Sequence, residues 1–219
     1  VNLPATWQEQ LPNGIAMLGS QSFETPTTDI LLKIPAGLYF ETADTLGTTA
    51  MLAALLNESS ENYSAEAMAM ALQKLGSSIA VSSDDQNINV FVSSLSKNLP
   101  ATLDLLEEKL FRPAFSVADF ERLKLQSIQG LEHATKDAGY QADRAFRELM
   151  FGQHIARFDQ TGTLVSLQQM QLAAVQALYQ KQFKPTGAQL ILVSDLAKAD
   201  VVALLNGKLA KWQGQGAAM

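Results

Sequence analysis

The sequence lacks cysteine and has little histidine. Among its 219 residues there is no Cys, and there are two His, His133 and His154. The absence of Cys excludes disulfides, thiolate zinc sites, iron–sulfur clusters and cysteine nucleophiles. A catalytic zinc ion usually takes three protein ligands from His, Cys, Asp and Glu. Two histidines that lie 21 residues apart therefore give little material for a zinc centre.

Positive charge and long apolar runs are also scarce. Lys and Arg number 16 against 22 Asp and Glu, which gives a net charge of −6, and no basic run occurs. Because phosphate neutralisation needs clustered cations, we expect no nucleic-acid partner. No apolar stretch reaches the roughly 18 residues of a membrane span, so we expect no transmembrane segment. The chain opens at Val1 with neither a start Met nor a signal peptide, and we expect it to be part of a longer polypeptide.

The apolar content and its periodicity predict a folded α+β domain. Apolar residues make up 47% of the chain, which excludes a disordered protein. The predicted order of elements lacks a regular β-α-β alternation, which favours a single mixed β-sheet with helices layered on it. We assign residues 1–212 to this single domain and residues 213–219 to a tail or linker. The predicted strands are 15–20, 28–35, 79–83, 88–93 and 188–194, and the predicted helices are 44–57, 65–75, 97–111, 117–135, 140–151, 166–182 and 197–210.

Several boundaries carry local signals. Ser64 and Ser116 suit helix N-caps, and Gly76 suits the position after a helix. Ser166 with Gln169 has the spacing of a capping box, so it predicts a helix start at Ser166. The run that begins at Asp84 favours a turn between two strands of a hairpin.

The residues that could carry chemistry are few and have structural explanations. His133 and Asp137 would share a face if one helix spans both, as a solvated pair. His154 follows an expected helix end, where a cation complements the macrodipole. Glu107 and Glu108 favour a solvated helix face. Neither a nucleophile elbow nor a phosphate-binding glycine motif is present.

Five segments, taken in order, resemble one family over nearly the whole chain. They are LPNGI at 11–15, the run from Ile34 through Gly47 into the 50–56 helix, LQKLGSSIAVSS at 72–83, LFRPAFSVADFERLK at 110–124 and YQKQFKPTGAQLILVSDL at 179–196. This order is similar to that of the pitrilysin/insulinase-type zinc metallopeptidases, which include mitochondrial processing peptidase. The resemblance implies the metallohydrolase fold of that family.

The chain departs from the family at the active site. Members that cut peptides carry H-x-x-E-H on the first helix, where two His bind zinc and the Glu polarises the attacking water. Aligned on Gly47, those three positions are Ala50, Ala53 and Ala54. The family's third ligand, a Glu, aligns near Gly130, with Glu132 a small shift away. The resemblance therefore implies no catalytic residue, no metal and no cofactor in this domain.

The resemblance is strongest to the third domain of long, four-domain bacterial zinc peptidases that are exported to the periplasm. It implies a non-catalytic domain that forms chamber wall and domain interface around a peptide substrate, with zinc held by a catalytic sister domain. It also implies a periplasmic or cell-envelope location. Two alternatives remain open: an active peptidase with unusual ligands from Glu132, His133 and His154, and a free-standing binding or assembly module without a link to proteolysis.

Overall fold

A computed structural model describes residues 5–216, and its centre is one mixed sheet of six strands. The strand order across the sheet is β1-β2-β6-β3-β5-β4, in which β2 and β6 run parallel and the other neighbours run antiparallel. The strands are β1 (Thr6–Gln10), β2 (Ala16–Gln21), β3 (Thr27–Pro35), β4 (Ser78–Ser83), β5 (Asn87–Leu95) and β6 (Gln189–Ser194). The prediction of an α+β domain with a single mixed sheet is confirmed.

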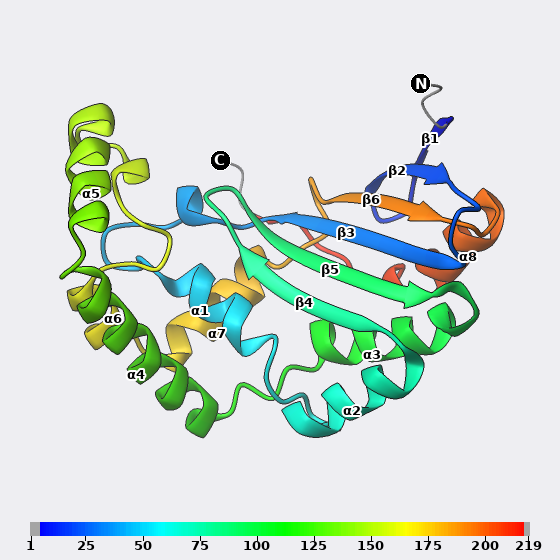
Figure 1. Cartoon of the computed structure of the whole chain (residues 1–219), viewed down its shortest axis with the longest axis horizontal. Coiled ribbons are helices and arrows are strands. Elements are labelled where there is room, and N and C mark those ends of the chain that lie inside the picture. The colour runs from blue at the N-terminus through cyan, green and yellow to red at the C-terminus, as the bar shows by residue number, and fades with distance from the viewer. Residues whose placement is uncertain (1–4, 217–219) are drawn as a thin grey trace.

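The helices gather on one face of this sheet and leave the other face open (Figure 1). No helix within residues 5–216 is long and apolar enough to cross a membrane. The α-helices are α1 (Thr48–Leu55), α2 (Ala65–Leu75), α3 (Leu99–Phe111), α4 (Val117–Ala134), α5 (Ala138–Phe151), α6 (Leu164–Gln169), α7 (Leu172–Gln182) and α8 (Lys198–Leu209), and the 3-10 turns are η1 (Leu38–Phe40), η2 (Ser96–Asn98) and η3 (Ile155–Arg157).

The core lies between the sheet and these helices. In β3, Ile30, Leu32 and Ile34 are buried at every second position, as one face of a strand requires. Leu52 and Leu55 of α1 join the same core cluster. The helix is apolar because it crosses the middle of the core, in contact with β4, α4 and α7.

Three predicted helix boundaries are confirmed by their caps. The Ser64 hydroxyl accepts a hydrogen bond from the Ala67 N–H at 3.1 Å, and the Ser116 hydroxyl accepts one from the Asp119 N–H at 3.4 Å. Gly76 ends α2 with a left-handed φ of 61°.

The single helix predicted over 166–182 is wrong, because the structure has α6 and α7 in its place. Thr163 is the N-cap of α6, and Ser166 is its third residue in a reciprocal capping box. The chain leaves helical geometry at Met170, whose ψ is 135° and whose side chain is buried. The Lys124 ammonium donates to the Met170 carbonyl at 2.8 Å, which satisfies the acceptor at the break.

Two further elements differ from the prediction, β1 and α1. The edge strand β1 is absent from it, because the sequence TWQEQ is polar and only Trp7 is partly buried. Trp7 packs on Gly19, where a Cβ would lie 2.1 Å from its ring. Helix α1 is shorter than the predicted 44–57 helix. Of the predicted tail, residues 217–219 lie outside the described residues, as do residues 1–4 of the predicted domain.

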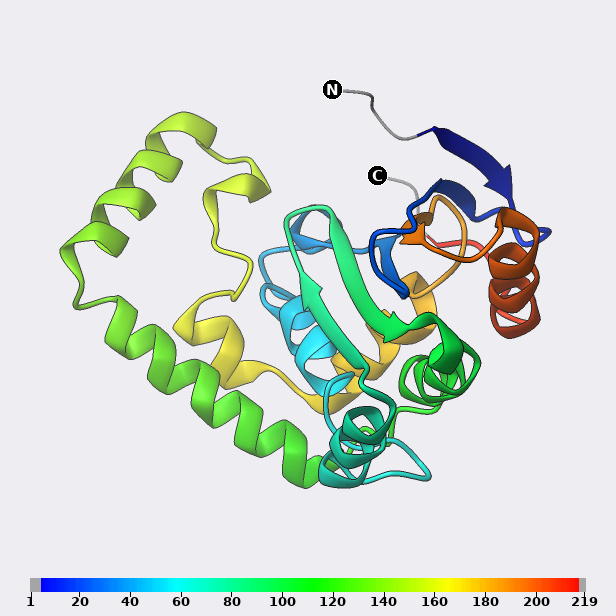
Figure 2. The same ribbon diagram turned by 45° about the vertical axis from the view of Figure 1, so that its right-hand side comes forward.

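Helices α4 and α5 form an arm at one end of the molecule, and α5 extends away from the sheet (Figure 2). No residue of α5 is buried. Phe146, Leu149 and Met150 are among its most exposed apolar side chains. This arm and α6 line a cavity.

Candidate functional site

The N-terminus of α1, the helix that aligns with the family's zinc motif, is held by a buried carboxylate. The Glu41 side chain is 8% exposed and accepts hydrogen bonds from the Gly47 N–H at 2.8 Å and the Thr49 N–H at 2.6 Å. Burial raises the pKa of Glu41, while these hydrogen bonds act in the opposite direction. An anion at this end complements the helix dipole.

Gly47 is required where it stands. Its φ is 85°, and a Cβ there would lie 2.6 Å from the Thr161 carbonyl oxygen. The segment before α6 therefore packs directly on the start of α1.

The C-terminus of α1 is held by a buried cation. The Lys109 ammonium, from α3, donates to the carbonyl oxygens of Leu56 at 3.1 Å and Asn57 at 3.2 Å. Lys109 is 4% exposed, and burial lowers its pKa. Hydrogen bonds to Glu41 at one end and from Lys109 at the other thus hold α1 in position.

The positions that align with zinc ligands offer only methyl groups. Ala53 is buried, and Ala50 and Ala54 are half-buried on the same helix. Alanine preserves the helix but donates no electron pair to a metal. That these positions have no catalytic role, and that the domain binds no cofactor, stay predictions.

The predicted pair of His133 and Asp137 on one helix face is wrong. Helix α4 ends at Ala134, and Asp137 is instead the N-cap of α5, where it accepts from the Tyr140 N–H at 2.9 Å. His133 and its neighbour Glu132 are exposed at the end of α4.

His154 also has a different role from the one predicted. It is the N-cap of η3, and its Nδ1 accepts from the Ala156 N–H at 3.2 Å. The Arg157 guanidinium, not His154, donates to the carbonyl of Gly152 after α5, at 3.2 Å. Within residues 5–216, no three His, Asp or Glu side chains are grouped so that they could hold a metal ion.

Glu108 is not on a solvated face as predicted, because its side chain is buried. It accepts from the Asn62 N–H at 3.0 Å and from the Arg112 guanidinium at 2.6 Å. Burial alone would raise the pKa of Glu108, but the hydrogen bonds from Arg112 and Asn62 outweigh it and lower the pKa. Glu107 forms ion pairs with Arg112 and Lys208 on the surface. The two carboxylates therefore tie α3 to its surroundings.

The free edge of β4 is closed at its centre by a side chain from the end of α1. The Asn57 amide donates to the Val81 carbonyl at 2.7 Å and its oxygen accepts from the Val81 N–H at 2.9 Å. These are the two backbone groups with which an added peptide strand would pair. Asn57 thus occupies the place of one residue of a seventh strand.

The open face of the sheet carries an apolar row that crosses five strands in register. Leu18 lies beside Ile191, Ile191 beside Leu31, Leu31 beside Phe91, and Phe91 beside Ala80. We call these five residues the outer row. Phe91 is 48% exposed and Ile191 38% exposed, and a shallow depression of about 380 Å³ runs along part of the row. The alternating pattern of side chains along β5 and β6 could have indicated that some apolar residues face outward. The order of the strands, which places these residues side by side, cannot be derived from the sequence.

The chain matches a family model and two curated relatives. The model described as Insulinase (Peptidase family M16) matches residues 17–157. The "Non-peptidase homolog YmxG" of Helicobacter pylori is 22% identical over 204 residues, which cover 93% of this chain and 47% of that protein. The beta subunit of the mitochondrial-processing peptidase of Saccharomyces cerevisiae is 22% identical over 134 residues, 61% of this chain and 29% of that subunit. The chain thus spans less than half the length of these relatives.

Solved structures show the same fold. The inactive domain of a peptidase M16 from Pseudomonas fluorescens superposes with a TM-score of 0.93 at 22% identity, over 98% of this chain and 53% of that one. The periplasmic protease PqqL from Escherichia coli gives a TM-score of 0.86 at 16% identity, over 98% of this chain and 25% of that one. The match to the family model, together with the shared fold, shows that the chain belongs to the insulinase family, peptidase family M16.

Proposed function

We propose that this chain is a non-catalytic domain of a larger zinc metalloendopeptidase, in which it forms chamber wall and an interface with a sister domain. The observation that carries the proposal is the state of α1. Its two ends are held by Glu41 and Lys109, so the helix that carries the zinc motif in the family is in place. The positions that align with the zinc ligands and the catalytic base are all alanine: Ala50, Ala53 and Ala54. A helix that is held in place but lacks the metal-binding side chains supports a structural role for this domain.

The outer row supports the interface with a sister domain. Its side chains leave an apolar strip on a sheet face that no helix of the described chain covers (Figure 1). Exposed apolar patches of this kind mark contact sites. The relatives extend well beyond the length of this chain, so further domains of the same polypeptide are available to cover it.

The closed edge of β4 bears on how a peptide substrate would be held. Because Asn57 occupies the backbone groups of Val81, a peptide would have to displace it before adding to the centre of β4. We therefore propose that the parent protein holds its peptide substrate against the chamber wall and the sister domain, and not by strand addition at this edge. Zinc would be held by the sister domain.

A periplasmic location is part of the same proposal. Its support is the resemblance to exported peptidases and the fold shared with PqqL, which is a periplasmic protease.

The interface can be tested by association of this domain with the remaining domains of its parent, produced separately. We expect the two parts to co-elute in size-exclusion chromatography, and the variant Ile191→Asp with Phe91→Asp to abolish this. Both side chains are partly exposed, so the variant should keep the circular dichroism spectrum and melting of the original. Leu149→Asp on α5, which is 87% exposed, is the matched control and should co-elute.

Two outcomes would contradict the proposal. Equal association of the outer-row variant and the control would remove the interface from this face. A parent that encodes no H-x-x-E-H in a sister domain or partner subunit would favour the free-standing binding or assembly module instead.

A further inference from the structure

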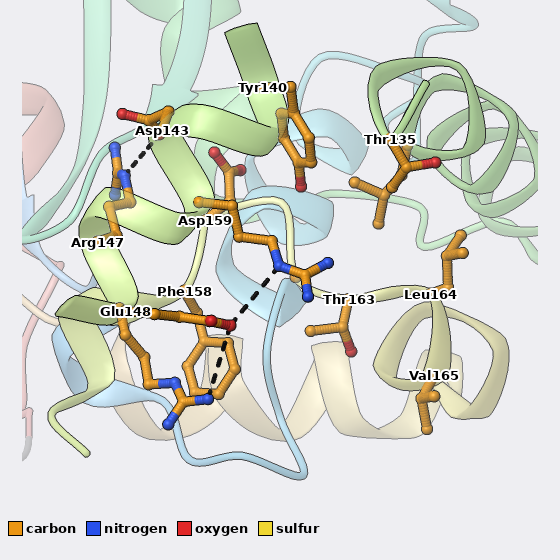
Figure 3. A pocket seen from close by; sticks show the side chains of 14 residues that line it. Thr135, Tyr140, Asp143, Arg147, Glu148, Phe158, Asp159, Thr163, Leu164 and Val165 are labelled. Atoms are coloured by element: carbon orange, nitrogen blue, oxygen red, sulfur yellow. Dashed lines mark hydrogen bonds and ion pairs between the residues drawn. The ribbon is translucent and has the colours of Figure 1, made fainter. Parts of the chain in front are cut away.

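A cavity of about 340 Å³ lies between the arm of α4 and α5 and the segment that leads into α6 (Figure 3). This volume is within the range of small-molecule sites. Its apolar lining comes from Leu131, Phe158, Leu164 and Val165. The cavity shares no lining residue with the outer row, so it is a separate feature of the domain.

The polar face of α5 lines this cavity, and its apolar face is exposed. The cavity-lining residues recur at helical spacing, and the exposed apolar side chains fall on the opposite side of the helix. The lining residues are Tyr140, Asp143, Arg144, Arg147 and Glu148, and the exposed ones are Phe146, Leu149 and Met150.

Two of the three carboxylates in the lining are already engaged. Asp143 accepts from the Arg147 guanidinium at 2.9 Å. Asp159 accepts from the N–H and hydroxyl of Thr161, at 2.8 Å and 2.6 Å. These contacts engage one oxygen of each carboxylate, and of the two it is Asp143 that is paired with a cation.

The third carboxylate is shared between two guanidinium groups. One oxygen of Glu148 lies 3.6 Å from Nε of Arg144 and 3.9 Å from a terminal nitrogen of Arg157. These separations exceed a hydrogen bond. This group of three side chains has one positive charge in excess, while the lining as a whole has three Arg and three carboxylates. The terminal nitrogens of Arg144 have no hydrogen-bond partner among the described residues.

A second donor faces the same space. The Tyr140 hydroxyl points into the cavity (Figure 3), and within residues 5–216 it has no hydrogen-bond partner. Burial raises the pKa of Tyr140, so its hydroxyl carries a proton at neutral pH. The cavity therefore combines an apolar wall with two groups that have donor hydrogens free for a ligand, the terminal nitrogens of Arg144 and the hydroxyl of Tyr140.

We propose that this cavity binds a carboxylate that bears an apolar group, with Arg144 and Tyr140 donating to the carboxylate and Leu131, Phe158 and Leu164 contacting the apolar part. A guanidinium matches a carboxylate in charge and planar geometry. Two sources have this chemistry: the C-terminal residue of a peptide and a short fatty acid. The site does not depend on the proposed chamber function, so either can fail without the other.

The test is a calorimetric or NMR titration of the described domain with three probes. N-acetyl-leucine should bind, and N-acetyl-leucinamide, which lacks the carboxylate, should bind about tenfold more weakly because a charge-assisted hydrogen bond is lost. Octanoate distinguishes the sources: tighter binding of octanoate supports a fatty acid, and tighter binding of N-acetyl-leucine supports a peptide C-terminus. Equal binding of the acid and the amide, or no binding of either acid, would overturn the proposal.

Two variants test whether the ligand binds in this cavity. Arg144→Gln should weaken binding of N-acetyl-leucine about tenfold, and Tyr140→Phe should weaken it by a smaller factor. Arg144 is largely exposed, so the variant should keep its fold, which circular dichroism checks. Arg122→Gln, on α4 and paired with Glu58 and Asp119, is the matched control and should bind like the original. Equal effects of the Arg144 and Arg122 variants would also overturn the proposal.

Discussion

Asn57 pairs with Val81 through both polar atoms of its amide, at 2.7 Å and 2.9 Å. The same amide nitrogen also donates to the Ala53 carbonyl at 3.1 Å. One side chain thus links the end of α1 to the free edge of the sheet and satisfies the edge groups at its centre. Unpaired sheet edges promote association with other chains, and this pairing limits that.

Asn57→Ala should lower the free energy of unfolding by about 1 kcal/mol, because water can replace part of the lost hydrogen bonding at an edge. It should also increase association of the domain with itself, since the Val81 groups become free. Urea unfolding and light scattering measure the two effects. Gln129→Ala, at an exposed position of α4 whose side chain forms no hydrogen bond in the described chain, should change neither.

Lys109→Met should lower the free energy of unfolding by about 2 kcal/mol, because the carbonyls of Leu56 and Asn57 lose their donor at a buried helix end. The apolar stem is retained, so packing changes little. Urea unfolding at neutral pH measures the loss. Lys74→Met, on the exposed side of α2, is the control and should be near neutral; an equal effect of both would contradict a capping role for Lys109.

Glu41→Gln should change the pH dependence of stability. Burial raises the pKa of Glu41 in the folded state, so its contribution is full below the ordinary glutamate pKa and falls as the pH rises through the raised value. Gln does not titrate. The stability advantage of the original chain over the variant should therefore shrink as the pH rises above 4.5, as measured by urea midpoints. An advantage that grows with pH would show that the carboxylate form is favoured instead.

Ala50→His with Ala54→His should create a metal site on α1, because two His one helical turn apart can bind one ion. Zn²⁺ or Ni²⁺ at a hundredfold excess over its dissociation constant should stabilise this variant by about 3 kcal/mol relative to the same variant without metal. Thermal melts with and without the ion measure this. Ala50→His alone should gain much less, and an equal gain would show that the two positions do not face one ion.

Local signals were predicted well from the sequence, because caps and turns depend on neighbouring residues. Ser64, Ser116 and Gly76 act as predicted, and Asp84 accepts from the backbone N–H groups of Gln86 and Asn87 in the predicted turn. The break at Met170 could not be predicted in this way, because its carbonyl partner, Lys124, lies 46 residues earlier on α4.

The site was predicted only where it depends on a motif. The three alanines of α1 are visible in the sequence by resemblance, whereas the groups that hold the helix come from distant segments. The sequence alone suggests that Glu108 is a surface residue, because its hydrogen-bond partner Asn62 lies 46 residues earlier in the chain. The outer row depends on the insertion of β6 between β2 and β3, which no local pattern indicates.

The most direct test of the central claim is the zinc content of the purified domain after incubation with Zn²⁺ and removal of free ion, measured by elemental analysis. We expect no zinc above the level of the buffer, since the helix that would seat it presents methyl groups. One zinc ion per chain, lost in Glu132→Ala, His133→Ala or His154→Ala, would contradict the assignment of this domain as non-catalytic.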